Sequence, residues 1–342
     1  MIDASRNRIV RLCTGMVAAW AVLQGGEICA HAQASPGAQQ PGKAATPSTA
    51  PPVTDSLPVP VRLGGAPDFA FAAYQRGNYV TAMREAMKRI EADPGDGPAM
   101  TLIGELYLHG LGVRSDATEA ARWYKLAAER SDPAGMFALG IAKLNGEGVP
   151  QDRAGAAGLF EQAAAQNHPG ALYNLGVLAL GNAGGAPDYE KAARLFKQSA
   201  ELGLSDAAYA LGLLYRKGTG VEQSDAQAAQ WIGRAARDDN VPAQVEYAIM
   251  LFNGIGVAKD ETAAAKLFLK AAARNNPVAQ NRAARILAAG RGLPKDMVEA
   301  MKWHLLAKSA GEKDAWLDGE LAKLSAQEKS AVEASMHEYV GN

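Results

Sequence analysis

The chain has 342 residues, 35 of them basic and 36 acidic, and 48% of the chain is apolar while only 6% is aromatic. This balanced charge excludes the basic footprint that a nucleic-acid binder needs for phosphate contacts. The 70 alanines and 36 glycines predict a core of small side chains. Such a core suits closely packed helices better than a barrel or sandwich, which needs branched and aromatic residues.

The N-terminal segment has the pattern of an export signal. Three arginines precede an uncharged stretch at 12–23, and Ala30 and Ala32 offer small residues at the −3 and −1 positions of a cleavage site. These features predict a secretory signal peptide at 1–32 and a periplasmic or secreted protein. The apolar run is shorter than the roughly 20 residues of a membrane span. Whether the signal is cleaved or kept as an anchor stays open.

Both cysteines of the chain, Cys13 and Cys29, lie within the predicted signal peptide. The rest of the chain therefore has no disulfide and no cysteine-based metal site. Residues 33–66 follow with 7 of the 17 prolines. A segment with so little apolar bulk cannot bury enough surface to fold, so we expect a disordered Pro/Ala-rich spacer.

A 36-residue period runs through the remainder. It is visible first in glycine pairs on one grid: Gly110/Gly112, Gly146/Gly148, Gly218/Gly220, Gly254/Gly256 and Gly290/Gly292, with Asn182/Gly184 in the third slot. A second column is acidic: Asp116, Asp152, Asp188, Asp260 and Asp296. A third column is small: Gly104, Gly140, Gly176, Gly212, Ala248 and Ala284. Registered copies of this kind indicate a repeat architecture.

Each copy has the pattern of two helices joined by a glycine turn. Apolar residues of the first helix recur at helical spacing, the glycines permit positive φ, and the aspartate is placed to cap the second helix. The small column lets neighbouring helices approach closely. Because one helix pair cannot bury its own apolar face, we expect the copies to stack into an all-α superhelical solenoid.

The motif A-x-x-x-L-G-x-x-Y-x-x-G-x-G-V-x-x-D-x-x-x-A-x-x-W-x-x-x-A-A resembles the Sel1-like repeat, a relative of the tetratricopeptide repeat. Six copies cover 98–313, and the third departs most, in the segment LALGNAGGAPDYE. Residues 67–97 resemble a tetratricopeptide unit and would form the N-terminal cap. Residues 314–342 would supply capping helices, the last opened by the capping box Ser325-x-x-Glu328.

No residue set predicts catalysis, a cofactor or a metal. The glycine pairs lack the third glycine and preceding strand of a dinucleotide site, and the aspartates are spaced for capping rather than for a shared carboxylate dyad. None of the histidines has the spacing of a zinc helix, and His109 and His168, beside turns, are expected to be solvated loop residues. Some relatives in the Sel1-like group are associated with β-lactams, but these resemble cysteine-rich repeats, unlike this chain.

A binding surface remains as the functional candidate. The resemblance to tetratricopeptide solenoids implies that the first helix of each pair lines a concave groove. Aromatic anchors beside arginines are typical of a binding hot spot. The predicted partner-binding residues are Phe137, Tyr173, Tyr209, Arg216, Phe252, Arg282 and Arg285. Packing between adjacent helices is the alternative role for the aromatic members.

These features predict a non-enzymatic exported scaffold that binds a protein or peptide, with no nucleic-acid partner and no membrane span after signal cleavage. Exported Sel1-like proteins include regulators that bind the outer part of a sensor kinase, so the resemblance implies a membrane sensor or cell-envelope complex as the regulated partner. Two alternatives stay open. One is an enzyme acting on β-lactams or peptidoglycan, and the other is a glycan-binding module with Tyr173 and Tyr209 as stacking platforms.

Overall fold

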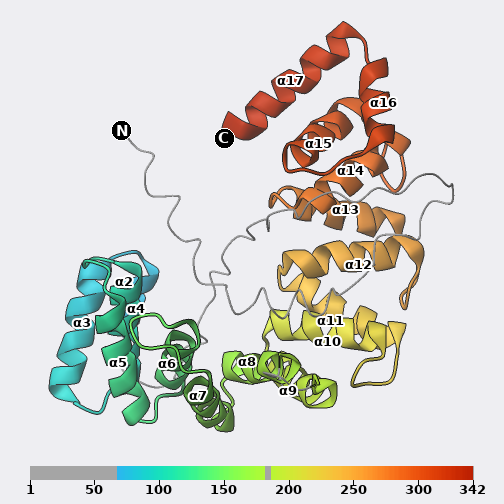
Figure 1. Ribbon diagram of the computed structural model, residues 1–342. Coiled ribbons are helices and arrows are strands. Elements are labelled where there is room, and N and C mark those ends of the chain that lie inside the picture. The colour runs from blue at the N-terminus through green and yellow to red at the C-terminus, as the bar shows by residue number, and fades with distance from the viewer. Residues whose placement is uncertain (1–67, 182–185, 342) are drawn as a thin grey trace. The chain divides into compact units, whose positions relative to one another are not determined.

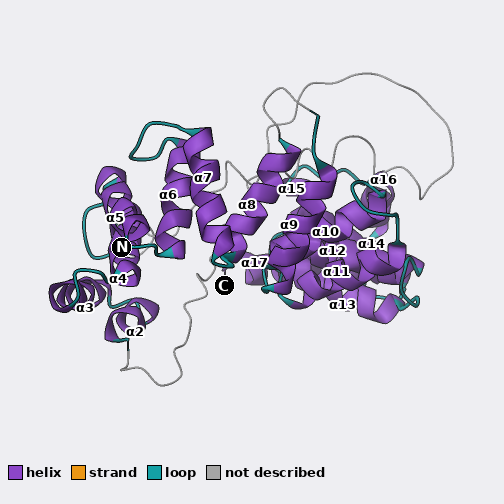
Figure 2. Ribbon diagram, turned by 90° about the horizontal axis from the view of Figure 1, so that it is seen from below, coloured by secondary structure: helices purple, strands orange, loops and turns teal. Residues whose placement is uncertain are grey.

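The computed structural model describes residues 68–181 and 186–341. These residues form sixteen α-helices and no strand (Figures 1 and 2), which confirms the all-α prediction. The chain divides into two compact units, one ending at Leu195 and the other beginning at Phe196. The predicted signal peptide and spacer lie outside the described residues.

The first unit is a series of short helices in which each packs against the next in the chain, from α2 on α3 through α7 on α8. Neighbouring first helices also meet, as α4 does with α6. The helices are α2 (Phe69–Gln75), α3 (Tyr79–Ala92), α4 (Gly97–His109), α5 (Ala117–Glu129), α6 (Pro133–Asn145), α7 (Arg153–Ala165) and α8 (Pro169–Leu180). Helix α9 (Tyr189–Glu201) crosses the boundary between the units.

The second unit continues the same alternation, with α10 on α11 through α14 on α15. Its helices are α10 (Ser205–Lys217), α11 (Asp225–Arg237), α12 (Val241–Asn253), α13 (Glu261–Ala272), α14 (Pro277–Ala289), α15 (Met297–Ser309), α16 (Ala315–Lys323) and α17 (Ala326–Gly341). Helix α17 turns back onto α15, where the rings of Tyr339 and Trp303 meet edge to face with centroids 5.2 Å apart.

The glycine pairs form the turns that the sequence predicts. The first glycine of a pair ends the first helix in the left-handed region, for example Gly146 at φ 72°, and the second, Gly148, has φ 71°. Residues with a Cβ reach this region only at a cost. The third copy differs: Gly181 ends α8 at φ −100°, and residues 182–185 lie outside the described part of the chain.

The second glycine of a pair also brings consecutive repeats together. A Cβ on Gly148 would overlap the carbonyl oxygen of Ala117, at the start of the preceding repeat's second helix, and Gly256 stands in the same relation to Asp225. A Cβ on the first glycine, Gly146, would come no closer than 3.3 Å to Gln151 Cβ. The two glycines therefore share a backbone requirement, but only the second is also required by packing.

The acidic column caps the second helices, as predicted. Each carboxylate accepts a backbone N–H from the first helical turn at 2.8–3.1 Å, an arrangement found at Asp116, Asp152, Asp188, Asp260 and Asp296. Ser224 takes this position in the fourth copy, accepting from the Gln227 N–H at 3.3 Å. These bonds satisfy donors that a helix start leaves open.

A further periodic feature ends the second helices and was not anticipated from the sequence. Non-glycine residues occupy the left-handed region with φ of 59–60° at Ser131, Asn167, Asp239 and Asn275, and glycines fill the same column at Gly203 and Gly311. Asn, Asp and Gly tolerate this conformation best. The column was therefore visible in the residue types at a 36-residue step.

The small column lets the two helices of a repeat approach closely. A Cβ on Gly140 would lie 2.6 Å from Phe160 Cε1, and one on Gly104 would overlap the ring of Tyr124. Phe160 is fully buried and Tyr124 nearly so. Glycine is thus needed in α4 and α6 because a large ring from the partner helix covers the position.

The capping box at the start of α17 is also confirmed, since the Ser325 N–H donates to the Glu328 carboxylate and the Glu328 N–H donates to Ser325 Oγ.

Candidate functional site

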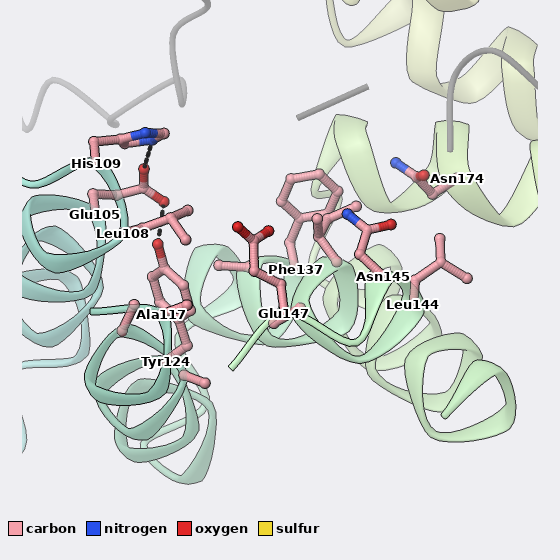
Figure 3. Close-up of a pocket in the computed structure, with 15 residues that line it drawn as sticks. Glu105, Leu108, His109, Ala117, Tyr124, Phe137, Leu144, Asn145, Glu147 and Asn174 are labelled. Atoms are coloured by element: carbon pink, nitrogen blue, oxygen red, sulfur yellow. Dashed lines mark hydrogen bonds and ion pairs between the residues drawn. The ribbon is translucent and has the colours of Figure 1, made fainter. Parts of the chain in front are cut away.

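The first unit contains a pocket among the helices of its first repeats (Figure 3). Its volume is about 200 Å³. The walls come from the first helices α4, α6 and α8 and from the second helix α5. Mostly apolar side chains line it, among them Leu108, Phe137, Ile141 and Leu144. Phe137 is the predicted site residue that lines this pocket.

One end of the pocket is acidic. Glu105 of α4 accepts a hydrogen bond from the Tyr124 hydroxyl at 2.8 Å and lies 3.2 Å from His109 Nε2 (Figure 3). The hydrogen bond to Glu105 raises the pKa of His109, with a further contribution from the charge of Glu147. Burial, with the nearby charge of Glu105, raises the pKa of Tyr124 well above its usual value. The hydroxyl of Tyr124 therefore stays a donor that fixes Glu105.

The second acidic group, Glu147, lies in the glycine turn that follows α6. Both neighbours in the chain are left-handed glycines, Gly146 and Gly148, so the turn has a defined backbone. Within residues 68–181 and 186–341, the carboxylate of Glu147 makes no ion pair or hydrogen bond. It is thus an acidic group at the pocket that has no direct bonding partner in the described part of the chain.

Phe137 is held from two sides. Its ring stacks on the imidazole of His168, with centroids 4.6 Å apart and an interplanar angle of 28°, and tilts against Phe160 at 5.8 Å. Beyond it, Asn174 of α8 is 8% exposed and donates its amide to the Gly170 carbonyl at 2.8 Å. The aromatic wall and the Asn174 amide are therefore fixed before any ligand arrives.

The expectation of a solvated loop histidine at His168 is wrong. The residue is 8% exposed and caps α8, its Nδ1 accepting the Ala171 N–H at 3.2 Å. Burial lowers the pKa of His168 to about 4, because a buried imidazolium loses its hydration. The position belongs to a capping column of the first helices, which also holds Asp132, Asn240 and Asn276. His109 is exposed at the last turn of α4, where its Nε2 lies 3.2 Å from a Glu105 carboxylate oxygen.

The two predicted tyrosines are largely covered. Tyr173 of α8 is 8% exposed and Tyr209 of α10 is 9% exposed. An anchor for a partner needs ring surface that the partner can bury, and these side chains offer little. Their positions agree with the alternative weighed in the sequence, packing between adjacent helices.

The remaining predicted residues lie in the second unit. Arg216 of α10 pairs with Glu246 of α12, and both side chains are mostly buried. Phe252 of α12 is half-buried, and the guanidinium of Arg291 lies 4.3 Å from its ring centroid. Each of the two residues thus already has a partner within the chain.

Arg282 and Arg285, both on α14, have different surroundings. Arg285 donates to both carboxylate oxygens of Asp314, at 2.5 and 2.9 Å, and its guanidinium lies 5.5 Å from the Trp316 ring centroid. Asp314 is 5% exposed and also caps α16. Arg282 is half-buried and forms no ion pair with any described residue. Arg285 therefore joins α14 to α16, while Arg282 is available to a ligand.

Sequence reasoning missed the polar residues of the pocket. Asn174 follows the aromatic column by one position, in the column that also holds Arg282, and Glu147 lies between the two glycines of a pair. The signal that could have found them is departure from the repeat pattern, since these positions vary from copy to copy while the structural columns repeat.

The described residues contain neither a metal-binding cluster nor a helix that could span a membrane. No three His, Cys, Asp or Glu side chains in 68–181 and 186–341 gather closely enough to hold a metal ion. Likewise, none of the helices in this part of the chain combines the length and apolarity of a membrane span.

Comparison with known proteins identifies the repeat. The family model of the Sel1 repeat matches six consecutive segments, at 97–132, 133–168, 169–204, 205–240, 241–276 and 277–312. A solved structure of a Sel1 repeat protein from Oxalobacter formigenes is 31% identical, with a TM-score of 0.64, covering 70% of this chain and 98% of that one. No curated protein matches.

Two further solved structures are more distant. One is a protective antigen present in uropathogenic Escherichia coli strains, displaying an SLR fold. The two proteins are 27% identical, the alignment covers 80% of this chain and 67% of the antigen's chain, and the TM-score is 0.47. An immunity protein from Pseudomonas aeruginosa is 17% identical over 62% of this chain and 81% of its own, with a TM-score of 0.40.

The fold is thus that of a tetratricopeptide-like α-solenoid. Since the matched repeats occupy more than half of the sequence, the chain belongs to the Sel1 repeat family. Sel1 repeats generally mediate protein–protein interaction, and proteins built from them are generally non-enzymatic scaffolds.

Proposed function

We propose that this chain is an exported, non-enzymatic scaffold that binds a protein or peptide partner along the first-helix face of its repeats. Through this binding it regulates a membrane sensor or another cell-envelope complex. The observation that carries the proposal is the pocket between α4, α5, α6 and α8, in which the Phe137 ring and the Asn174 amide are held in place. Surfaces arranged before binding lose less entropy on association.

Export is supported by the sequence alone, through the arginines, the apolar stretch 12–23 and the small residues Ala30 and Ala32. Fractionation of cells that express the chain with a C-terminal tag tests it. We expect the tagged protein outside the inner membrane, with a mature N-terminus at Gln33. A chain found in the cytoplasm with its N-terminus intact contradicts export.

The glycan-binding alternative receives less support than a peptide partner. It needs Tyr173 and Tyr209 as open stacking platforms, and the exposed fractions of 8% and 9% leave little ring surface for a sugar.

The enzymatic alternative requires a constellation of acid, base or nucleophile, and the pocket's titratable groups are Glu105, His109, Tyr124 and Glu147. Of these, Glu105 is engaged by Tyr124 and His109.

The proposal is tested by cross-linking in intact cells followed by mass spectrometry, with two matched variants. Ala138→Gln fills the pocket from α6 with an uncharged side chain, and Ala154→Gln places the same side chain on an exposed position of α7. We expect one protein to be cross-linked to the wild type and to Ala154→Gln but lost from Ala138→Gln. Equal recovery with both variants contradicts a partner site at this pocket.

A further inference from the structure

The pocket of the first unit has the dimensions and lining of a site for one side chain. Its volume is about 200 Å³, and Leu108, Ile141 and Leu144 present aliphatic surface along it. Lysine and arginine carry a methylene stem that packs on such surface while the charged end reaches a polar group. The volume and the aliphatic lining therefore suit a long side chain with a polar tip.

The charged side chains that line the pocket are mainly acidic. Of the fifteen lining residues, Glu105 and Glu147 are acidic, and none is lysine or arginine. His109, the one lining histidine, faces Glu105 at 3.2 Å. The Glu147 carboxylate forms no ion pair or hydrogen bond with a described residue, and its charge helps to raise the pKa of His109 through space. Its field therefore extends across the pocket toward α4.

The neighbours of Glu147 complement a cation in two other ways. The ring of Phe137, held by His168 and Phe160, offers a π face or edge within the same pocket, and cations are attracted to aromatic faces. Asn145 and Asn174 add carboxamide groups to the lining (Figure 3). A carboxamide oxygen can accept a hydrogen bond from an ammonium or guanidinium group.

We infer that this pocket receives a lysine or arginine side chain of the bound peptide, with Glu147 as its counter-charge. The inference rests on the proposed function, because it names the side chain that the partner contributes. Phe137, Leu108 and Ile141 contact the methylene stem, and the cationic tip lies at the turn between Gly146 and Gly148. An acidic side chain is excluded from the pocket by Glu105 and Glu147.

A random dodecapeptide library displayed on phage and selected on the full chain tests this inference. We expect the selected peptides to share a lysine or arginine at one position. A synthetic peptide of the selected sequence, labelled with fluorescein, is then titrated with the wild type, with Glu147→Gln and with Glu161→Gln while fluorescence anisotropy is followed. Glu161 is exposed on α7 and away from the pocket lining, so its variant controls for the loss of one charge.

We expect Glu147→Gln to weaken binding about tenfold or more, the usual size for loss of one partner of a close charge pair, and Glu161→Gln to leave it unchanged. A peptide with norleucine in place of the basic residue should bind the wild type and Glu147→Gln equally. Raised salt should weaken the basic peptide more than the norleucine peptide. Glu147→Gln should keep the thermal midpoint of the wild type, because the carboxylate bonds to no described residue.

The outcomes separate the inference from the function on which it rests. Selected peptides without a shared basic position, or equal affinity for the wild type and Glu147→Gln, overturn the inference and leave peptide binding in place. A library that gives no binder to the wild-type chain contradicts both.

Discussion

The imidazole of His168 stacks on the ring of Phe137, 4.6 Å between centroids, and the same imidazole caps α8 through Nδ1. One buried side chain thus joins the start of a repeat's first helix to the aromatic wall of the pocket in the preceding repeat. The geometry requires a neutral ring, because Nδ1 must accept the Ala171 N–H, and this links the protonation of His168 to the stability of the first unit.

The first prediction concerns pH. The pKa of His168 is about 4 in the folded chain against 6.5 for an unperturbed histidine, so the unfolded state binds a proton first as the pH falls. Stability from this residue is complete above pH 6.5 and is lost progressively as the pH falls toward 4, by a few kcal/mol in total. His168→Asn, which copies the caps at Asn240 and Asn276, should remove this part of the pH dependence.

Urea unfolding followed by circular dichroism at pH 7.5 and at pH 5 measures the effect. We expect the wild type to lose more of its unfolding free energy between the two values than His168→Asn does. The carboxylates titrate in both proteins, so the difference isolates the histidine. Parallel losses in the two proteins would refute the role of His168.

The second prediction compares two glycines of one turn. Gly146 and Gly148 have nearly the same φ, 72° and 71°, so alanine costs each about 1 kcal/mol of left-handed strain. Only at Gly148 would the new Cβ also overlap the Ala117 carbonyl oxygen. Gly148→Ala should therefore lower the thermal midpoint clearly more than Gly146→Ala. Similar thermal midpoints for the two variants would show that the two repeats can move apart at this contact without a loss of stability.

The third prediction concerns the small column. Valine at Gly140 would place its Cβ only 2.6 Å from Phe160 Cε1, and overpacking a buried contact costs roughly 1–3 kcal/mol. Asp152→Ala removes a cap from the neighbouring helix, at a partly exposed site. We expect Gly140→Val to be the more destabilising of the two in thermal unfolding. The reverse order would mean that the helix crossing can open.

The fourth prediction separates two arginines of α14. Burial alone would raise the pKa of Asp314, but hydrogen bonds from Arg285, Asn281 and the Leu317 N–H lower it. Arg285→Ala leaves this nearly buried carboxylate without its cation and should cost about 2 kcal/mol or more, with α16 loosened. Arg282→Ala should stay within about 0.5 kcal/mol of the wild type.

Hydrogen exchange of the α16 amides and urea unfolding measure both variants. Capture of a cross-linked partner then gives Arg282 a separate readout, because its loss would occur without a change in stability. An Arg285→Ala protein as stable as the wild type would show that the ion pair with Asp314 does not hold α16.

The repeat columns explain why so much of the fold was predictable. A left-handed glycine, a capping aspartate or a glycine beneath a ring is required by contacts within about one repeat, and each recurs every 36 residues, so Gly146, Asp152 and Gly140 were assigned correctly. The left-handed positions at Ser131 and Asn167 follow the same rule. They were overlooked because several residue types satisfy it.

The surroundings of the candidate site residues were less predictable from the sequence than the fold was. Phe137, Tyr173 and Tyr209 occupy one column, yet Phe137 lines a pocket while the tyrosines are about nine-tenths buried. The turn beside His168 predicts a solvated loop residue, but the structure shows a buried helix cap. Arg285, a predicted partner-binding residue, forms an ion pair with Asp314 within the chain.

By itself the sequence determined the repeat, its helices, turns and caps, because these depend on local backbone conformation and on contacts that recur at a fixed spacing. Only the tertiary structure decided which side chains remain open to a ligand. Exposure depends on the side chains that neighbouring helices and turns place over a residue, and these, such as His168 on Phe137 or Arg291 over Phe252, differ from one repeat to the next.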